Sequence, residues 1–408
     1  MIFVGVDWAE AHHDVLVMDE AGVMLGRARC GVGVAGLAQL HALVADHAQE
    51  PEQVILGIEV DQGLLVRSLV GAGYRVYAIN PLAASRYRDR HTTSGAKSDA
   101  ADAKLLADLV RTDRHNHRPV AGDSDEAGAI KVLARAHQAL VWTRQRQANA
   151  LRSGLRDYFP AALEAFGADL AGRDALAVLA LAPTPERARA LSRAKIAAAL
   201  GRAGRERNRQ RRASEIQAAL ASEQLAAPAV VADALGATTS ARVVVLISLN
   251  QQIAELERAL GEHFDRHPDA EILHSLPGLG AVLGARVLGE FGDDPSRFGD
   301  ARGRKAYAGT APITKASGRS RVVLARVARN KRLADACEWW AFCSLTRSPG
   351  ARRYYDLLRA REKTHHQALR QLANRWVGIL HGCLEAGRRY GEDIAWPAEG
   401  PVGLEVAA

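Results

Sequence analysis

Hydrophobic and polar positions follow the period of strands at the start of the chain, and then alternate between strand and helix periods up to about residue 118. The predicted strands are residues 2–7, 13–19, 23–30, 53–60 and 74–81, and the predicted helices are residues 33–48, 63–73 and a segment that begins near residue 99. Three strands joined by short turns therefore come first, and helix, strand, helix, strand and helix follow. This order predicts an α/β domain.

The rest of the chain is predicted to be mainly helical. Long apolar periodicity at residues 129–159 and 243–264 indicates two arms of an antiparallel helical pair, with an Arg-rich insert at residues 201–215 between them. A Pro-Gly-x-Gly turn that leads into a helix within residues 274–293 is the pattern of a helix-hairpin-helix, which offers backbone N–H groups to phosphate. The stretch from Arg302 to Arg332 then has ten Lys or Arg and no Asp or Glu.

These elements predict a multidomain protein of α/β plus α class. The element order of residues 1–120 is that of a ribonuclease-H-like domain. Residues 121–268 are expected to form a helical coiled-coil region with the Arg-rich insert, and residues 269–355 a mostly helical domain with the helix-hairpin-helix-like element. Residues 356–408 are expected to be a helical C-terminal extension with a polar tail. The length of 408 residues agrees, because one core rarely serves so long a chain.

Four acidic residues end predicted elements of the first domain. Asp7 follows the first strand, Glu59 follows the fourth, and Asp99 and Asp102 stand three apart on the last helix. If the first and fourth strands are neighbours, the acids converge, and close carboxylates repel unless cations lie between them. Mg²⁺ prefers oxygen ligands, and two ions could stabilise the attacking and leaving oxygens in phosphodiester chemistry. The four acids therefore predict a site for two Mg²⁺ ions, although an acid at a helix start is also a common cap.

Other polar residues near these acids are less specific. Asp61 lies two residues after Glu59 and could assist it, whereas Asp14 is expected to face solvent. His12 and His13 are expected to lie at the surface or at a strand edge, and a role for them near the metals stays open.

The charge of the chain favours a polyanionic partner, since its formal net charge is +8 and its pI is about 9.5. The candidate phosphate contacts are Lys97, Arg302, Arg304, Lys305, Lys315, Arg319, Arg321 and Arg326. The central arginines are explained equally well as phosphate contacts or as a solvated helix face, and they are Arg202, Arg205, Arg207, Arg209, Arg211 and Arg212. Trp339, Trp340 and Phe342 could stack on bases, but such a cluster is more often part of a core.

Cysteine usage and hydropathy bear on the compartment. The four cysteines show no paired C-x-x-C spacing, and no apolar run was found to reach the length of a membrane span. We therefore expect a protein of a reducing cytoplasm that is not bound to a membrane.

Several segments resemble one known family. GVDWAEAHHDV, GIEVDQG, INP and KSDAADAKLLADL resemble the DEDD-type transposases of bridge-RNA-guided insertion sequences, whose N-terminal domain is RuvC-like. LPGLGAVLGARVLGEFGD and RKAYAGTAPITKASGRSR resemble the C-terminal transposase domain of that family. The resemblance implies an acidic tetrad of Asp7, Glu59, Asp99 and Asp102. It also implies donor and target DNA, a non-coding guide RNA encoded beside the gene, and a homo-oligomer such as a dimer or tetramer.

The resemblance also implies a nucleophilic serine that precedes a glycine in a basic loop. Ser317 in KASGRSR has this position, and it would hold DNA as a phosphoserine intermediate. Ser320 lies three residues later, so both serines stay candidates. From the residues alone, Ser-Gly in a basic loop is usually a turn, although Lys315 and Arg319 could clamp a phosphate. The serine and the acids lie in different predicted domains, so they can meet only by domain packing or across a multimer.

Four functions compete at this point. The resemblance favours an RNA-guided recombinase that moves an insertion sequence, and the alternative is a RuvC-like metal nuclease that uses water and has no need of Ser317. An actin-like ATPase is disfavoured, because DWAEAHH lacks the Gly-rich phosphate turn of that fold. A catalytically idle nucleic-acid-binding protein is disfavoured because it has no reason to concentrate acids beside DNA.

Overall fold

The computed structural model describes residues 1–91, 99–117, 119–120 and 122–397. Its contacts divide the chain into two compact units. The first comprises residues 1–123 with residues 294–297, and the second comprises residues 124–293 and the chain from residue 298 onward. The predicted division into four domains stays a prediction.

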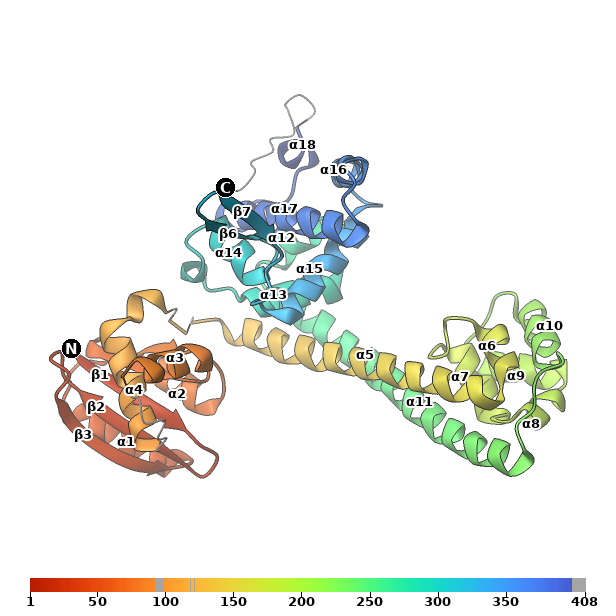
Figure 1. Ribbon diagram of the computed structural model, residues 1–408, viewed down its shortest axis with the longest axis horizontal. Helices are drawn as coiled ribbons and strands as arrows, with labels where there is room; N and C mark the ends of the chain where they lie inside the picture. The colour runs from red at the N-terminus through yellow and green to blue at the C-terminus, as the bar shows by residue number, and fades with distance from the viewer. Residues whose placement is uncertain (92–98, 118, 121, 398–408) are drawn as a thin grey trace. The chain divides into compact units, whose positions relative to one another are not determined.

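A five-stranded mixed sheet is the basis of the first unit (Figure 1). Its strands are β1 (Ile2–Trp8), β2 (His12–Met18), β3 (Met24–Gly31), β4 (Val54–Ile58) and β5 (Arg75–Ala78). They lie in the order β3-β2-β1-β4-β5, and β1 pairs antiparallel with β2 and parallel with β4. The prediction that the first and fourth strands are neighbours is thus confirmed.

Helices cover both faces of this sheet. The long helices of the first unit are α1 (Val34–Ala45), α2 (Leu64–Gly71), α3 (Pro81–His91) and α4 (Asp99–Thr112), with 3₁₀ turns at Pro51–Gln53, Arg114–Asn116 and Pro295–Arg297. α1 and α2 pack with Val4 and Val6 on one face of the sheet. α3 and α4 pack with Phe3 and Ile55 on the other face. Even-numbered residues of β1 therefore point to α1 and α2, and odd-numbered residues point to α4.

Two strand glycines let α4 approach the sheet closely. A Cβ atom at Gly5 would lie 1.8 Å from the carbonyl oxygen of Ala103, and one at Gly57 would lie 2.7 Å from that of Leu106. Any other residue would push the helix away from the strands, so these two positions set the distance between α4 and the sheet.

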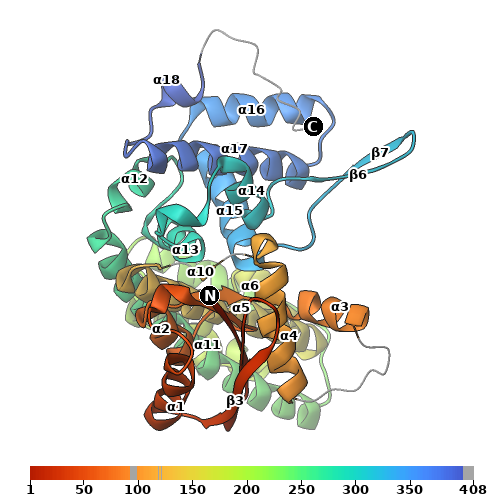
Figure 2. The ribbon, with the colours of Figure 1, turned by 90° about the vertical axis from the view of Figure 1, so that its left-hand side faces the viewer.

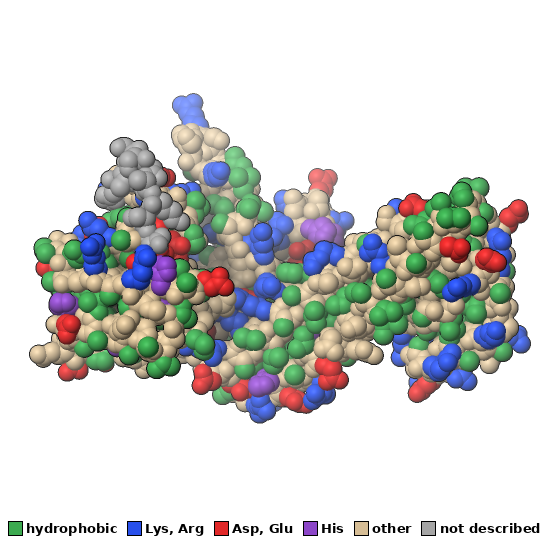
Figure 3. Space-filling model, turned by 90° about the horizontal axis from the view of Figure 1, so that it is seen from below, with side chains coloured by type: hydrophobic (Ala, Val, Ile, Leu, Met, Phe, Trp, Pro, Cys, Tyr) green, Lys and Arg blue, Asp and Glu red, His purple; other side chains and the backbone are tan. Residues whose placement is uncertain are grey.

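The second unit contains the predicted helical pair. α5 (Asp125–Tyr158) and α11 (Ala229–Arg266) pack against each other. Figure 3 shows hydrophobic side chains along an exposed face of this pair. By length and composition alone, α11 is apolar enough to cross a membrane, which the sequence analysis missed. In the structure it packs against α5 and against helices of its own unit.

Five shorter helices lie between the two arms and share a core of their own. They are α6 (Pro160–Phe166), α7 (Arg173–Leu181), α8 (Pro185–Arg189), α9 (Arg193–Arg202) and α10 (Arg209–Leu220). Tyr158, at the end of α5, is buried among them, and its hydroxyl donates a hydrogen bond to the carbonyl oxygen of Pro183 (2.6 Å). The helical prediction for this region is confirmed.

The C-terminal helices form a second large core in the same unit. They are α12 (Ala270–Ser275), α13 (Ala281–Phe291), α14 (Ala301–Ala308), α15 (Lys331–Ser344), α16 (Pro349–Ala360), α17 (His365–Glu385) and α18 (Glu392–Ala395). Trp340 of α15 and Trp376 of α17 stack at 5.5 Å and are fully buried. Trp340 is thus a core residue, and α17, which the sequence analysis did not link to any motif, is central to this core.

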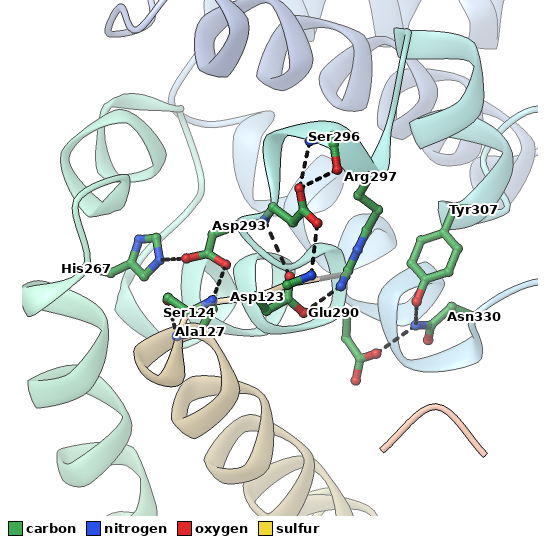
Figure 4. A network of polar contacts seen from close by, with 12 residues as sticks. Asp123, Ser124, Ala127, His267, Glu290, Asp293, Ser296, Arg297, Tyr307 and Asn330 are labelled. Carbon is green, nitrogen blue, oxygen red and sulfur yellow. Dashed lines mark hydrogen bonds and ion pairs between the residues drawn. The ribbon is translucent and has the colours of Figure 1, made fainter. Parts of the chain in front are cut away.

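Buried polar contacts join α5 to α13 (Figure 4). Asp293 accepts a hydrogen bond from the backbone N–H of Ser124, the N-cap of α5 (2.9 Å). Glu290, only 3% exposed, accepts hydrogen bonds from Arg135 at 2.7 and 2.9 Å. It also accepts one from the side-chain amide of Asn330 at 2.7 Å (Figure 4). Asn330 also caps α15. The carboxylate of Glu290 therefore positions the start of α15, directly after the basic stretch.

A two-stranded hairpin projects from the second unit (Figure 2). β6 (Ile313–Ser317) and β7 (Ser320–Leu324) pair antiparallel, and the side chains from Lys315 to Leu324 are exposed. Gly318, the first of the two turn residues, has φ of +55°, and Arg319 is not among the residues with positive φ. Gly at the first central position is typical of a type II′ hairpin turn. The predicted basic loop is therefore the tip of a hairpin.

Candidate active site

Asp7 and Glu59 both lie at the carboxyl edge of the sheet, at the ends of the paired strands β1 and β4. β1 and β4 pair in register, with Gly5 opposite Gly57 and Val6 opposite Ile58. One residue further along come Asp7, in β1, and Glu59, which directly follows the end of β4. Asp7 continues the face of β1 on which Gly5 touches α4. Both side chains are half-buried.

α4 runs antiparallel to β1, and its first turn approaches these two acids. The guanidinium of Arg114, after the end of α4, lies 5.5 Å over the ring of Phe3, whereas Ala103 meets Gly5. Asp7, two residues beyond Gly5, is therefore next to the first turn of α4. Asp102, in this turn, is 6% exposed. Asp99 is the first residue of α4, and its side chain lies outside the described part.

The charge of Asp102 is partly balanced within the unit. The guanidinium of Arg88, on α3, lies 2.5 Å from a carboxylate oxygen of Asp102. Among the side chains that the structure describes, no group of three His, Cys, Asp or Glu is close enough to hold a metal ion. The donors at this edge are carboxylate oxygens, which suit a hard divalent cation such as Mg²⁺. The fourth expected ligand, Asp99, is outside this test.

Two polar residues beside the acids differ from expectation. Asp14 is buried and accepts two hydrogen bonds from Arg29, at 3.1 and 3.0 Å, so the expectation that it faces solvent is wrong. His13 is 5% exposed, because it points to the same face as Val15 and so into the unit. Asp61 is exposed, beyond the end of β4.

Ser317 and Ser320 form the closing pair of the hairpin. Both are exposed at its tip. Opposed residues share a face, so Lys315, which is opposite Val322, lies on the same face as the two serines. Arg321 is opposite Ala316 and lies on the other face. Of these two basic side chains, only Lys315 shares the face of the candidate nucleophiles.

The remaining candidate phosphate contacts differ in exposure. Arg302 and Arg319 are exposed, and Lys305 and Arg326 are half-buried. Arg304 is buried, with its guanidinium 5.2 Å from the ring centre of Phe291 and 5.0 Å from that of Phe298. This packing accounts for Arg304 without DNA. Lys97 lies outside the described residues.

The central arginines divide in the same way. Arg205 pairs with Asp174 at 2.6 Å, and Arg212 donates a hydrogen bond to the carbonyl oxygen of Ala165 at 2.8 Å. Arg211 and Arg212 also approach Glu215. The side chains of Arg202, Arg207 and Arg209 are exposed. Part of this run therefore stabilises the small helical core.

The aromatic residues of α15 face two ways. Trp340 is core, as described above, but Trp339 is 53% exposed. Phe342, one turn later, is also exposed and meets Trp339 edge to face at 5.9 Å. Of these three aromatic residues of α15, Trp339 and Phe342 are thus exposed for stacking on bases.

Comparison with known proteins agrees with the two-part arrangement. A transposase model of the DEDD type found in IS110 matches residues 4–160, which include the acids. A model of the transposase IS116/IS110/IS902 family matches residues 270–356, which include the hairpin. A putative transposase of IS117 from Streptomyces coelicolor is 46% identical over 97% of this chain and 96% of its own length. The chain belongs to the IS116/IS110/IS902 transposase family. It is an enzyme that cuts and rejoins DNA.

A more distant relative covers the same length. The uncharacterized 42 kDa protein of insertion element IS900 from Mycobacterium paratuberculosis is 32% identical over 94% of this chain and 95% of its own. Membership of a DEDD transposase family indicates use of a divalent metal ion. The carboxylates of this transposase at the edge of its first sheet have the donor chemistry for such an ion.

Proposed function

We propose that this transposase moves an insertion sequence with a RuvC-like, ribonuclease-H-like metal site and a serine nucleophile, guided by an RNA of the element. The observation that supports the proposal is the parallel pairing of β1 and β4, which brings Asp7 and Glu59 to the same edge of the sheet, with α4 packed against both strands. Acids that gather at the ends of adjacent parallel strands support a chemical site, because packing alone gives little reason to bring like charges together.

Asp7, Glu59, Asp99 and Asp102 are the proposed ligands of two Mg²⁺ ions. The ions would stabilise the charge that develops on the attacking and leaving oxygens. Arg88 balances Asp102 in this structure, so a cation there would share or replace the charge of the guanidinium. The buried position of Asp102 excludes water and strengthens any electrostatic contact that it makes.

Ser317 is the proposed nucleophile. Its Oγ attacks the phosphorus of one phosphodiester, the Oγ–P bond forms as one P–O bond to deoxyribose breaks, and the departing strand end takes up a proton as a hydroxyl. The hydroxyl proton of the serine passes to a base or to water. A free serine is a weak nucleophile, and Lys315 on the same face is suited to stabilise the developing charge.

Donor and target DNA are the proposed substrates, and exposed basic side chains are their proposed phosphate contacts. These are Arg302, Lys315, Arg319 and Arg321, with Lys305, Arg326 and Lys97 as further candidates. Pairing with a guide RNA would then select the sites. We further propose that the enzyme works as a dimer or tetramer in the bacterial cytoplasm, since two DNA partners must be cut and joined.

The deciding experiment detects a covalent adduct. Purified protein is incubated with Mg²⁺, RNA transcribed from the flanks of the element, and end-labelled donor and target DNA, and the products are separated on a denaturing gel. We expect a protein–DNA adduct that is absent with Ser317→Ala and with Asp102→Ala. Ser320→Ala is the matched control, because Ser320 is the partner of Ser317 in the closing pair of the hairpin.

The same gel tests the alternative of a RuvC-like nuclease that uses water. Cleavage without an adduct, unchanged by Ser317→Ala but lost with Asp102→Ala, would refute the serine step and leave metal-dependent hydrolysis. An adduct that is lost only with Ser320→Ala would move the nucleophile to that residue. Reactions without RNA that still select the same sites would refute RNA guidance.

A further inference from the structure

A pocket opens next to the acids, on the face of the sheet opposite α4. Its volume is about 790 Å³, and it lies between the ends of β1 and β4 and the starts of α1 and α2. Its walls are mainly apolar, and Trp8, Val34 and Leu64 are exposed around it. Trp8 directly follows Asp7 and points to the other face of the strand. The pocket is therefore adjacent to the proposed reaction site but separate from the face that α4 covers.

The starts of two helices supply hydrogen-bond donors to this pocket. Gly33 is the N-cap of α1 and Gly63 is the N-cap of α2, with φ of +94° and +113°. Both glycines line the pocket. A glycine cap has no side chain to accept hydrogen bonds from the N–H groups of the first turn, so these donors are left for solvent or a ligand. The pocket thus combines apolar walls with donors from two helices.

His13 adds a buried polar group to the same wall. Its ring lies against that of Trp8, with the centres 6.5 Å apart and the planes within 21°. Its Nδ1 makes no hydrogen bond to any residue that the structure describes. Burial lowers the pKa of His13, more than the backbone of His12 raises it. The neutral ring has one donor and one acceptor, and a buried polar atom without a partner is unusual unless a ligand or water completes it.

We propose that this pocket holds one nucleobase, turned out of the DNA strand next to the phosphate that the carboxylates address. Trp8 supplies an exposed ring for stacking. The N–H groups at the starts of α1 and α2 suit carbonyl oxygens of the base, and His13 offers one further hydrogen bond. Asp7 and Trp8 are consecutive residues whose side chains point to opposite faces of β1. A base next to a phosphate at Asp7 could therefore reach the pocket at Trp8 by passing the end of this strand.

The charge of the pocket argues for a base and against a phosphate as its occupant. Glu10, Glu59 and Asp61 line it, and these carboxylates would repel a second anion. A neutral base avoids this repulsion, and its exocyclic amino groups can donate to the same carboxylates. The inference rests on the proposed function and deepens it, because it adds recognition of one unstacked base to the metal site.

The test compares a flap substrate with a fully paired one. The probe is a nicked duplex of the element's end with a one-nucleotide flap of 2-aminopurine at the nick, and binding is followed by 2-aminopurine quenching and by anisotropy. Wild type should quench the flap. Trp8→Ala should bind the flap about 5- to 150-fold more weakly, without quenching, and the paired duplex as wild type does. Trp8→Phe should keep most of the affinity.

Two further variants keep the test decisive. Trp142→Ala removes an exposed tryptophan of α5 that is not among the candidate nucleic-acid contacts, and it should leave flap binding unchanged. Leu64→Glu changes a residue that is 86% exposed, so it should fold normally and weaken flap binding by adding charge to the pocket. Equal flap-to-duplex ratios in wild type, Trp8→Ala and Leu64→Glu would overturn the proposal, as would an equal loss with Trp142→Ala.

The two proposals can fail separately. If wild type forms no adduct with the DNA of its element but quenches the flap through Trp8, the base pocket stands and the serine mechanism falls. If the adduct forms and depends on Ser317 but Trp8→Ala binds the flap as wild type does, the base pocket falls and the mechanism stands.

Discussion

Gly5→Ala tests whether the close approach of α4 to β1 assembles the acids. The added Cβ would lie 1.8 Å from the carbonyl oxygen of Ala103, a backbone atom that no side-chain rotation can move away. The helix must retreat by roughly 1.2 Å before the contact reaches even 3.0 Å, and overpacking of this kind costs about 3 kcal/mol or more. The retreat also moves Asp102 away from Asp7.

The expected loss of catalytic rate follows from the same displacement of α4. A misplacement of about 1 Å in a catalytic group can lower the rate about 100-fold. We therefore expect Gly5→Ala to lower adduct formation about 100-fold even at a temperature where the first unit is still folded. Gly71→Ala is the matched control, because a Cβ atom there meets no atom within 4 Å and the residue lies at the end of α2.

The assay pairs thermal melting of the full chain with the adduct gel on the same samples. Melting establishes that Gly5→Ala is folded at the assay temperature, and circular dichroism checks its strand content. Normal adduct formation by folded Gly5→Ala, or an equal loss with Gly71→Ala, would refute the argument that the approach of α4 positions the acids.

Three further predictions concern charges. Arg88→Ala removes a partner of buried Asp102, and we expect the free energy of unfolding to fall by about 2 kcal/mol. Added Mg²⁺ should largely restore this stability, as measured by thermal melting with and without Mg²⁺. An equal loss of stability in both conditions would count against a cation at Asp102. Lys315→Ala and Arg321→Ala should each reduce the slope of log affinity for DNA against log salt concentration by about 1. Only Lys315→Ala should also impair adduct formation, because Lys315 shares the hairpin face of the two serines. Equal impairment by both variants would contradict this assignment of faces. Hydrogen bonds from Arg135 hold the pKa of Glu290 below its ordinary value despite burial. The stability that ionised Glu290 contributes is therefore complete above about pH 4.3, and it is lost as the pH falls through the lower pKa of the folded state. The free energy of unfolding, measured in urea at pH 7 and at pH 3, should therefore differ less between the two pH values in Glu290→Gln than in wild type.

The sequence predicted the sheet well, because its signals are local and strong. Buried strands with a period of two and helices closed by glycine determine the element order, and this order left few possible topologies. Placing Asp7 and Glu59 on neighbouring strands then needed only the adjacency of the first and fourth strands. The register between β1 and β4, with Gly5 opposite Gly57, could not be read from the sequence, because it depends on how the strands pack together.

Other features depend on partners far away in the chain. The burial of Arg304 follows from two phenyl rings that the fold brings to it, and a basic sequence gives no sign of them. The hairpin from Ile313 to Leu324 was missed because almost all of its side chains are exposed, so its pattern lacks a buried face. His13 was expected at the surface because it follows another histidine, His12. Two polar residues in a row mask the alternation of buried and exposed positions that would identify His13 as buried.

The burial of Asp102 has its explanation in the packing of α4. Ala103, Leu106, Ala107 and Val110 form the stripe with which this helix packs on the sheet. Asp102 directly precedes Ala103, so the turn of α4 that meets Gly5 also carries the buried Asp102. The same turn of α4 thus packs on the sheet and carries Asp102, and Gly5 and Gly57 set the distance between this helix and the strands. A substitution in the apolar part of this stripe should therefore disturb the acids as well as the core.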